Sequence, residues 1–148
     1  ALLTTEMVDH FCTESLAGGA AVSAGVTASG VLLARYPQSQ RTYLKFRDER
    51  YSGSNLFALA GEAAMRAVEV WRRAEQQRKR PWRIAAVFGP GLLLGYLLRR
   101  FSLDEAMARV SQRIGVSVKA VKMPFAEAAI DVDKPADLTL VEEILGKA

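Results

Sequence analysis

Apolar and polar positions along the chain alternate between a helical spacing and an extended spacing, and turn residues separate the segments. The helical spacing predicts one helix that begins near Thr4 and ends at the glycine pair 18–19. It predicts five more over 29–36, 61–77, 90–99, 102–114 and 135–145. Extended segments predict strands over 20–26, 42–47, 55–59 and 116–121, and a strand over 125–130 that leads into the last helix. Strands interleaved with helices favour an α/β layered fold.

The same pattern predicts which side chains face the core. In helix 61–77 the apolar stripe is Ala64, Val68 and Trp71. In the last helix the inward positions are Leu138, Val141, Ile144 and Leu145. Segment 89–98 is apolar throughout but interrupted by glycine, and we interpret it as a buried helix that is well short of the roughly 20 residues needed to cross a bilayer. We therefore expect no membrane span.

Composition adds bounds on domain number and compartment. The 148 residues, of which 50% are hydrophobic and 24% charged, suit one globular domain over 1–148. Cys12 is the one cysteine, which excludes an internal disulfide framework. A chain of this kind with no apparent signal peptide is expected in the reducing cytoplasm.

Positive charge is concentrated in one segment. Residues 72–83 hold six Lys or Arg and one Glu, a local charge of +5, so the remainder carries −1 of the net +4. One interpretation is a solvated helix end that balances the helix dipole. Another is a clamp for an anionic substrate through Arg80 and Arg83. Contact with RNA or a membrane surface through this segment is a third hypothesis, whereas a broad DNA surface is disfavoured.

Three carboxylates and a lysine interrupt the apolar segment AAIDVDKPADL at 128–138. Asp131 and Asp133 are two apart, so in an extended backbone their side chains leave the same face and can converge on one hard cation. Pro135 suits the first turn of a helix, and Asp137 can turn toward that helix's N–H groups. The alternative is that Asp133 is only the helix cap.

Ser52, Gly53 and Asn55 supply a hydroxyl, free backbone N–H groups and an amide between two strands of an expected hairpin. We interpret this stretch as a loop that could hold a ligand, although most such loops are simple turns.

Several catalytic motifs do not occur in the sequence. It has no Cys-x-x-Cys, no Walker A loop and no Gly-x-Ser-x-Gly elbow. Its one histidine, His10, has no neighbours that would support a Ser-His-Asp triad. Zinc-dependent hydrolysis and acyl transfer are therefore disfavoured.

The segment AIDVDKPADL at 129–138, followed by Val141, Glu142 and Glu143, resembles the C-terminal signature of the NTP transferases. That family includes the molybdenum cofactor guanylyl- and cytidylyltransferases and sugar nucleotidyltransferases. The segments 52–57 and 80–82 also resemble members of this group. The likeness runs over most of the chain, and its specific part is the acidic signature.

The resemblance implies a nucleotide-diphosphosugar transferase-like fold with a mostly parallel or mixed sheet. It also implies Mg²⁺ at Asp131 and Asp133. Lys134 departs from the family pattern, which commonly has a capping residue such as threonine before the proline, and the alternative for this lysine is a place near a phosphate. The partners would be a nucleoside triphosphate and a small-molecule acceptor, and a homo-oligomer is left open. No segment matches the family's glycine-rich nucleotide loop, so we expect the C-terminal part of a longer, magnesium-dependent nucleotidyltransferase, inactive by itself. The alternative is a non-catalytic α/β module that binds a ligand or partner.

Overall fold

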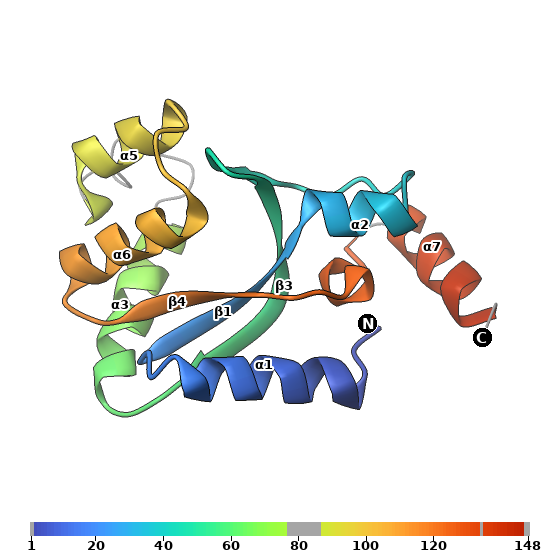
Figure 1. Cartoon of the computed structure of the whole chain (residues 1–148), viewed down its shortest axis with the longest axis horizontal. Coiled ribbons are helices and arrows are strands. Elements are labelled where there is room, and N and C mark those ends of the chain that lie inside the picture. The colour runs from blue at the N-terminus through green and yellow to red at the C-terminus, as the bar shows by residue number, and fades with distance from the viewer. Residues whose placement is uncertain (1, 77–86, 134, 147–148) are drawn as a thin grey trace.

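The computed structural model describes residues 2–76, 87–133 and 135–146 (Figure 1). The first half contains α1 (Thr5–Ala17), β1 (Val22–Ala28), α2 (Ser29–Arg35), β2 (Leu44–Lys45), β3 (Arg50–Leu59) and α3 (Ala63–Gln76). The second half contains α5 (Pro90–Leu97), α6 (Leu103–Ile114), β4 (Val118–Lys122), the 3₁₀ helix η1 (Ala126–Ala129) and α7 (Pro135–Gly146). All six predicted helices are present among these elements.

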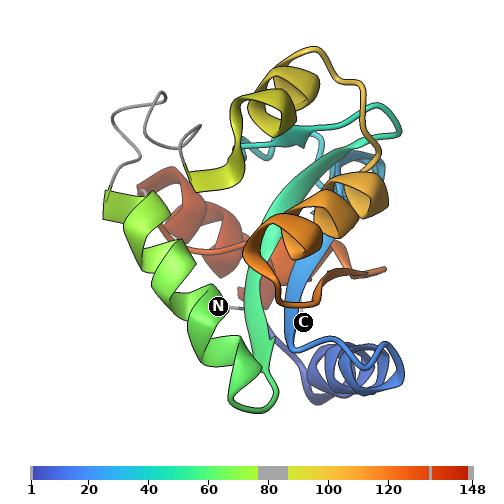
Figure 2. The ribbon, with the colours of Figure 1, turned by 90° about the vertical axis from the view of Figure 1, so that its left-hand side faces the viewer.

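The four strands form one mixed sheet in the order β2-β3-β1-β4. β1 pairs with β4 in parallel and with β3 in antiparallel, while β2 adds a two-residue antiparallel pair to the start of β3. The sheet curls between helices that lie on both sides of it (Figures 1 and 2). The expected α/β fold with a mixed sheet is confirmed. The predicted hairpin between 42–47 and 55–59 is wrong in register, because β2 pairs with Arg50 and Tyr51 at the start of β3 whereas 57–59 pair with β1.

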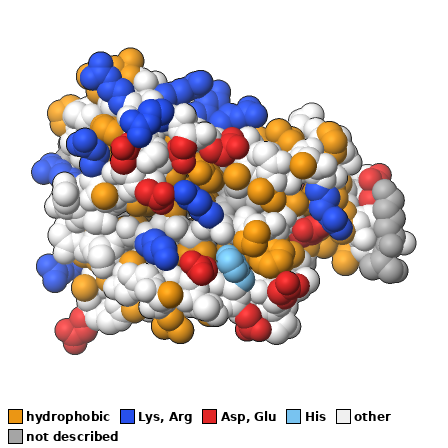
Figure 3. All heavy atoms as spheres, in the orientation of Figure 1, with side chains coloured by type: hydrophobic (Ala, Val, Ile, Leu, Met, Phe, Trp, Pro, Cys, Tyr) orange, Lys and Arg blue, Asp and Glu red, His pale blue; other side chains and the backbone are white. Residues whose placement is uncertain are grey.

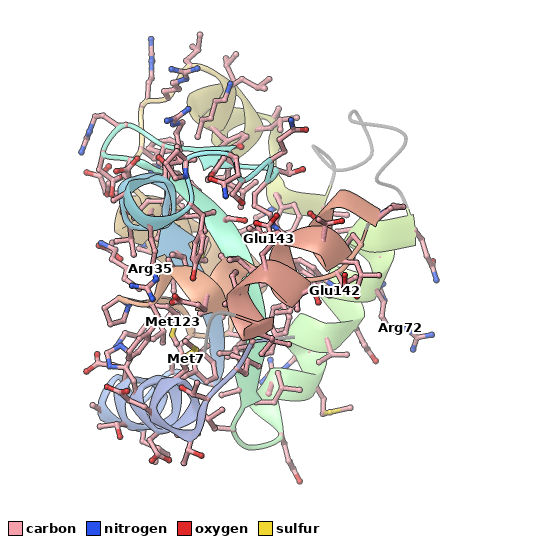
Figure 4. The ribbon with its side chains drawn as sticks, turned by 90° about the vertical axis from the view of Figure 1, so that its right-hand side faces the viewer. Met7, Arg35, Arg72, Met123, Glu142 and Glu143 are labelled. Atoms are coloured by element: carbon pink, nitrogen blue, oxygen red, sulfur yellow. The ribbon has the colours of Figure 1, made fainter. Side chains whose placement is uncertain are left out.

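Helices cover both faces of the sheet because side chains alternate along β4. Ala120 packs with α6 residues on one face, whereas Val121 packs with Met7 and Phe11 of α1 on the other. Figure 4 shows Met7 and Met123 near each other between α1 and the sheet. The two buried residues of β4 therefore belong to two separate hydrophobic clusters.

A third cluster lies at the end of the sheet where α2, η1 and α7 meet. Leu32 of α2 is fully buried there, and Ile130 and Val141 are 3% and 6% exposed. Ile130 immediately precedes the acidic segment, so this cluster anchors the chain at the point where Asp131 begins.

Helix boundaries follow local signals in the sequence. Ser102 caps α6 and Glu105 reaches back to the Ser102 N–H, which completes the capping box that the sequence predicts. Gly115 ends the same helix in the left-handed conformation. The Thr4 side chain accepts a hydrogen bond from the Met7 N–H at the start of α1. Such signals explain why these boundaries match prediction within a residue or two.

Two predictions about local structure are wrong. Residues 52–55 are not a loop, because β3 runs without interruption from Arg50 to Leu59. Residues 125–130 are not a strand, because Ala126–Ala129 form a 3₁₀ helix. In both places pairing and packing with distant segments decide the conformation, and neighbouring residues do not encode it.

Three predictions about burial are also wrong. Helix α5 is not buried, since Leu94, Leu97 and Leu98 at its end are each more than half exposed. Trp71 is 61% exposed and contacts Phe57, itself exposed, with ring centroids 6.3 Å apart. In α7, Val141 is buried, but the predicted core residues Leu138 and Leu145 are 47% and 60% exposed. Among the described residues, no helix combines the length and apolar character needed to cross a bilayer.

Candidate functional site: a polar pocket beside the acidic segment

A polar pocket of about 240 Å³ lies where three segments distant in the sequence meet. We call it the acidic pocket, and it is lined by Gln40, Arg41, Thr42, Ser52, Gly53, Asn55, Asp133 and Asp137. The two stretches that the sequence singles out, 52–55 and 131–137, thus share one site. The third stretch, 40–42, precedes β2 and was not predicted as part of a site.

A bulge in β3 presents Asn55 to this site. Ala24 of β1 pairs with Phe57 and Val26 pairs with Gly53, so Gly25 alone lies opposite three residues of β3. A Cβ atom at Gly25 would lie 3.2 Å from the Leu56 Cβ, so the close approach of the strands favours glycine there. Asn55 has a φ of 52°, a left-handed conformation that asparagine tolerates better than most residues. The bulge therefore breaks the alternation of the strand at Asn55.

The Asn55 amide holds Asp131. Its Nδ2 donates to the Asp131 Oδ2 at 2.6 Å, and the Val132 N–H donates to Oδ1 at 2.9 Å. Both carboxylate oxygens of Asp131 thus accept a hydrogen bond, one from a side chain of β3 and one from the next backbone N–H. Asp131 is fixed in position but is not itself one of the residues that line the acidic pocket.

The start of α7 forms another side of the site. The Asp133 N–H donates to the Asp137 Oδ2 at 3.2 Å, so the Asp137 carboxylate turns back toward the residues that precede the helix. The Asp133 side chain is 68% exposed. Both carboxylates lie near the positive end of the helix dipole, which favours negative charge at this place.

Arg41 links the acidic segment to the chain before β2. Its Nη1 donates to the Asp131 carbonyl at 3.1 Å and lies 3.9 Å from the Asp133 Oδ2, with only 12% of the side chain exposed. Sequence reasoning missed Arg41 as a site residue. Its one signal was its position in a polar stretch between Pro37 and the next strand.

A network beneath the acidic segment ties η1 to α2. The Tyr36 hydroxyl donates to the Glu127 Oε1 at 2.7 Å, and the Arg35 Nε lies 2.6 Å from the same oxygen. Figure 4 shows Arg35 on this side of the molecule. Burial raises the pKa of Glu127, but the Tyr36 hydrogen bond and the Arg35 charge outweigh burial, so the pKa lies below its ordinary value. Glu127 is therefore held as a carboxylate four residues before Asp131.

The donor set suits a hard cation. Asp133 and Asp137 offer carboxylate oxygens to the pocket, Ser52 and Asn55 add side-chain oxygens, and the Asp131 carboxylate lies beside it on Asn55. Mg²⁺ prefers such oxygens and keeps several waters, so it is commonly held through one or two protein carboxylates. Among the described residues, no group of three or more His, Cys, Asp or Glu is arranged to hold a metal by itself. The site thus fits an ion that shares its coordination with water and substrate.

The other predicted site residues divide into two groups. Ser52 is 3% exposed and lines the pocket beside Gly53. Ser54 instead faces the sheet interior, where its hydroxyl lies 3.1 Å from that of Thr27. Arg80, Arg83 and Lys134 lie outside the described residues, so their predicted contact with phosphate stays a prediction.

A comparison with solved structures gives one protein with the same fold. It comes from Thermus thermophilus and is described as a hypothetical transferase, with a TM-score of 0.79 and 34% sequence identity over 92% of this chain. This chain spans 58% of that protein's length. No protein-family model and no curated protein matches the sequence. The chain thus has the fold of this hypothetical transferase over nearly all of its own length.

Proposed function

We propose that this chain supplies the metal-binding and acceptor-binding part of a magnesium-dependent nucleotidyltransferase. The observation that carries the proposal is the acidic pocket, where Asp133 and Asp137 meet polar residues of β3, with Asp131 beside it hydrogen-bonded to Asn55 across 76 positions of sequence. The fold shared with a protein described as a hypothetical transferase supports group transfer as the reaction class. The acidic signature resembles that of the NTP transferases, which supports the nucleotidyl group.

Six residues of the pocket, and the neighbouring Asp131, have a task in this proposal. Asp131 and Asp133 would hold Mg²⁺, and when bound the ion supplies positive charge that offsets the charge developing at the α-phosphorus. Asn55 and Arg41 keep the acidic segment in place through the Asp131 carboxylate and carbonyl. Ser52, Gln40 and Thr42 offer hydrogen bonds to a hydroxyl or phosphate acceptor.

The proposed reaction balances without a further reactant. An acceptor oxygen attacks the α-phosphorus of a nucleoside triphosphate, the bond from that phosphorus to the bridging oxygen breaks, and pyrophosphate leaves. The acceptor proton goes to solvent or to a pocket carboxylate. The protein contributes orientation and charge stabilisation.

Metal binding can be tested directly with Mn²⁺ as a paramagnetic substitute for Mg²⁺. We expect low concentrations of Mn²⁺ to broaden the amide NMR signals of Asn55 and Asp133 first, and excess Mg²⁺ to reverse the broadening. Asp131→Asn and Asp133→Asn should each reduce the apparent affinity about tenfold or more, because each removes one hard anionic ligand. Glu142→Gln, which removes an exposed carboxylate from α7, is the matched control.

Activity needs a separate measurement. Release of pyrophosphate from each of the four common nucleoside triphosphates should be Mg²⁺-dependent in the polypeptide encoded by the whole natural reading frame. We expect no release by residues 1–148 alone. Broadening that is equally strong in Asp131→Asn and Asp133→Asn would refute the metal site. Nucleotide-dependent release of pyrophosphate by residues 1–148 alone would refute the proposal that this chain supplies only one part of the enzyme.

One observation favours a second candidate, a non-catalytic module in which the acids only fix the start of α7. Both Asp131 oxygens accept hydrogen bonds, and Asp137 accepts one from the Asp133 N–H. In that case Asp131→Asn would lower the melting temperature by the same amount with and without Mg²⁺. For the nucleotidyltransferase, Mg²⁺ should stabilise the natural chain and not the variant.

A further inference from the structure

The end of helix α5 presents an aliphatic stripe to solvent. Leu94, Leu97 and Leu98 are 57%, 65% and 54% exposed. Their spacing of three and four places them on one face of the helix. The opposite side of α5 is anchored, since the Tyr96 ring packs against Phe46 with the ring centroids 5.5 Å apart, and next to it the buried Gly95 leaves no room for a Cβ atom beside the Phe101 ring. The stripe thus faces away from the anchored side of the helix.

Arginines flank both ends of this stripe. Arg99 and Arg100 follow it directly, and their backbone N–H groups close the helix by donating to the Tyr96 and Gly95 carbonyls at 2.9 and 2.8 Å. From α6, the Arg109 guanidinium lies 4.3 Å from the centre of the Phe101 ring. Arg113 reaches the other end of α5, where its Nε would lie 3.8 Å from a Cβ atom at Gly89. We call the three leucines and these four arginines the leucine–arginine surface.

The surface has an excess of positive charge. Residues 87–114 contain those four arginines and two acids. The acids are paired with cations from other elements, Asp104 with Lys122 at 2.9 Å and Glu105 with Arg47 at 3.0 Å. Figure 3 shows Lys and Arg side chains gathered beside hydrophobic ones over the part of the molecule where α5 lies. A partner must therefore match both an apolar stripe and several cations.

We infer that the leucine–arginine surface docks on a lipid bilayer that contains anionic lipids. Leucine side chains enter the boundary between headgroups and acyl chains, while arginines extend their guanidinium groups to lipid phosphates. Single-stranded nucleic acid fits less well, because it is bound by aromatic side chains on which bases stack and this stripe is aliphatic. The inference does not depend on the proposed reaction, and it concerns a surface other than the basic segment at 72–83.

Cosedimentation with vesicles tests the inference on the 148-residue chain. We expect the chain to sediment with vesicles of phosphatidylcholine and phosphatidylglycerol in equal parts, and not with phosphatidylcholine alone. Each basic residue near an anionic surface contributes about fivefold to partitioning, so Arg99→Gln with Arg100→Gln should weaken binding about twentyfold. Leu94→Gln with Leu97→Gln should abolish it. Salt should weaken binding of the natural chain, because screening shortens the reach of the arginines.

Matched variants on other helices separate this surface from general stickiness. Leu138→Gln with Leu145→Gln removes two similarly exposed leucines from α7, and Arg72→Gln with Arg73→Gln removes two exposed arginines from α3. Both controls should bind vesicles like the natural chain. All the substituted side chains are exposed, so each variant is expected to fold. Circular dichroism and melting temperature check this. Equal loss in the controls would overturn the inference.

Two other occupants are distinguishable in the same series. If inorganic phosphate at millimolar concentration displaces the chain from vesicles as well as salt of equal ionic strength does and no better, the lipid proposal stands. Specific displacement by phosphate would replace it with a free-anion site. The chain could instead bind neither kind of vesicle and form a dimer that Leu94→Gln with Leu97→Gln converts to a monomer in light scattering. In that case the surface is a contact between copies and the lipid inference is wrong.

Discussion

The acidic pocket and the leucine–arginine surface differ in how their side chains are held. Beside the pocket, Asp131 is fixed by two residues that line it, Asn55 from β3 and Arg41 from the chain before β2, so distant segments determine the geometry of the site. On the surface, Leu94 and Leu97 project from one short helix, and their positions depend on local helical spacing and on the anchor at Gly95. The contrast suits a small polar ligand in the pocket and an extended, deformable partner on the surface.

This difference teaches where substitutions should act. A change at the surface that leaves the anchor intact alters binding with little effect on folding, because the side chains are already in water. A change in the pocket or its support alters binding and folding together, because hydrogen bonds between distant segments are lost. Three predictions test this contrast, from the largest expected effect to the smallest.

The largest effect is expected at the anchor of α5. A Cβ atom at Gly95 would overlap the Phe101 ring, whereas a Cβ atom at Gly91, in the same helix, would have open space around it. Gly95→Ala should lower the free energy of unfolding by about 1–3 kcal/mol because the ring must move, and should disrupt the surface while leaving the pocket intact. Gly91→Ala should instead stabilise by up to about 1 kcal/mol. Urea denaturation of both variants checks this, and equal effects would contradict it.

An intermediate effect is expected at the support of the pocket. Because the pKa of Glu127 is lower in the folded state than its ordinary value of 4.5, its stabilisation is present above that value and is lost as pH falls through the folded pKa. Glu127→Gln should cost about 1–2 kcal/mol at neutral pH, when the charged hydrogen bond from Tyr36 is lost.

Thermal melts from neutral pH to about pH 3 measure the difference in melting temperature between the natural chain and Glu127→Gln. The difference should become smaller as the pH falls below the ordinary pKa of a glutamate side chain. A variant of the leucine–arginine surface, Arg100→Gln, is the comparison. Its difference in melting temperature from the natural chain should not change over this pH range, because arginines stay charged throughout. A difference in melting temperature that is constant with pH would show that Glu127 acts by packing and not by its charge.

The smallest effect has opposite signs for stability and binding. Arg99 has a φ of 51° at the end of α5, where glycine is the favoured residue. Arg99→Gly should raise the free energy of unfolding by about 0.5–1 kcal/mol and yet weaken binding to anionic vesicles about fivefold. Arg100→Gln, which keeps the backbone strain, should weaken binding with no gain in stability. If stability and vesicle binding instead rise or fall together in Arg99→Gly, the binding surface depends on the conformation of the helix end, and the prediction is wrong.

Sequence reasoning found what neighbouring residues encode. The capping box at Ser102 and the glycine at 115 define α6, and the proline at 135 marks the start of α7. It also identified Ser52, Gly53, Asn55 and Asp133, which the fold brings to one pocket. Whether these residues bind substrate and metal stays a prediction.

What the sequence did not predict depends on contacts between distant segments. Arg41 becomes part of the site only because the chain before β2 packs beside Asp131, 90 positions later. Residues 52–55 were mistaken for a loop because their pairing with β1 is not visible in their own composition. The apolar character of α5 suggested burial, but in the part of the chain that the structure describes Leu94, Leu97 and Leu98 are each more than half exposed.

The bulge opposite Gly25 has a consequence for how such a pocket can diversify. In a regular strand, exchanging a ligand-facing residue also constrains its partners two positions away, because they share a face. At the bulge, position 55 does not follow that alternation. Ser54 still contacts Thr27 in the sheet interior, and Leu56 still packs against the cluster of Met7 and Phe11. Homologues could therefore vary the side chain at this single position and change what the pocket accepts, while the sheet and its cores remain the same.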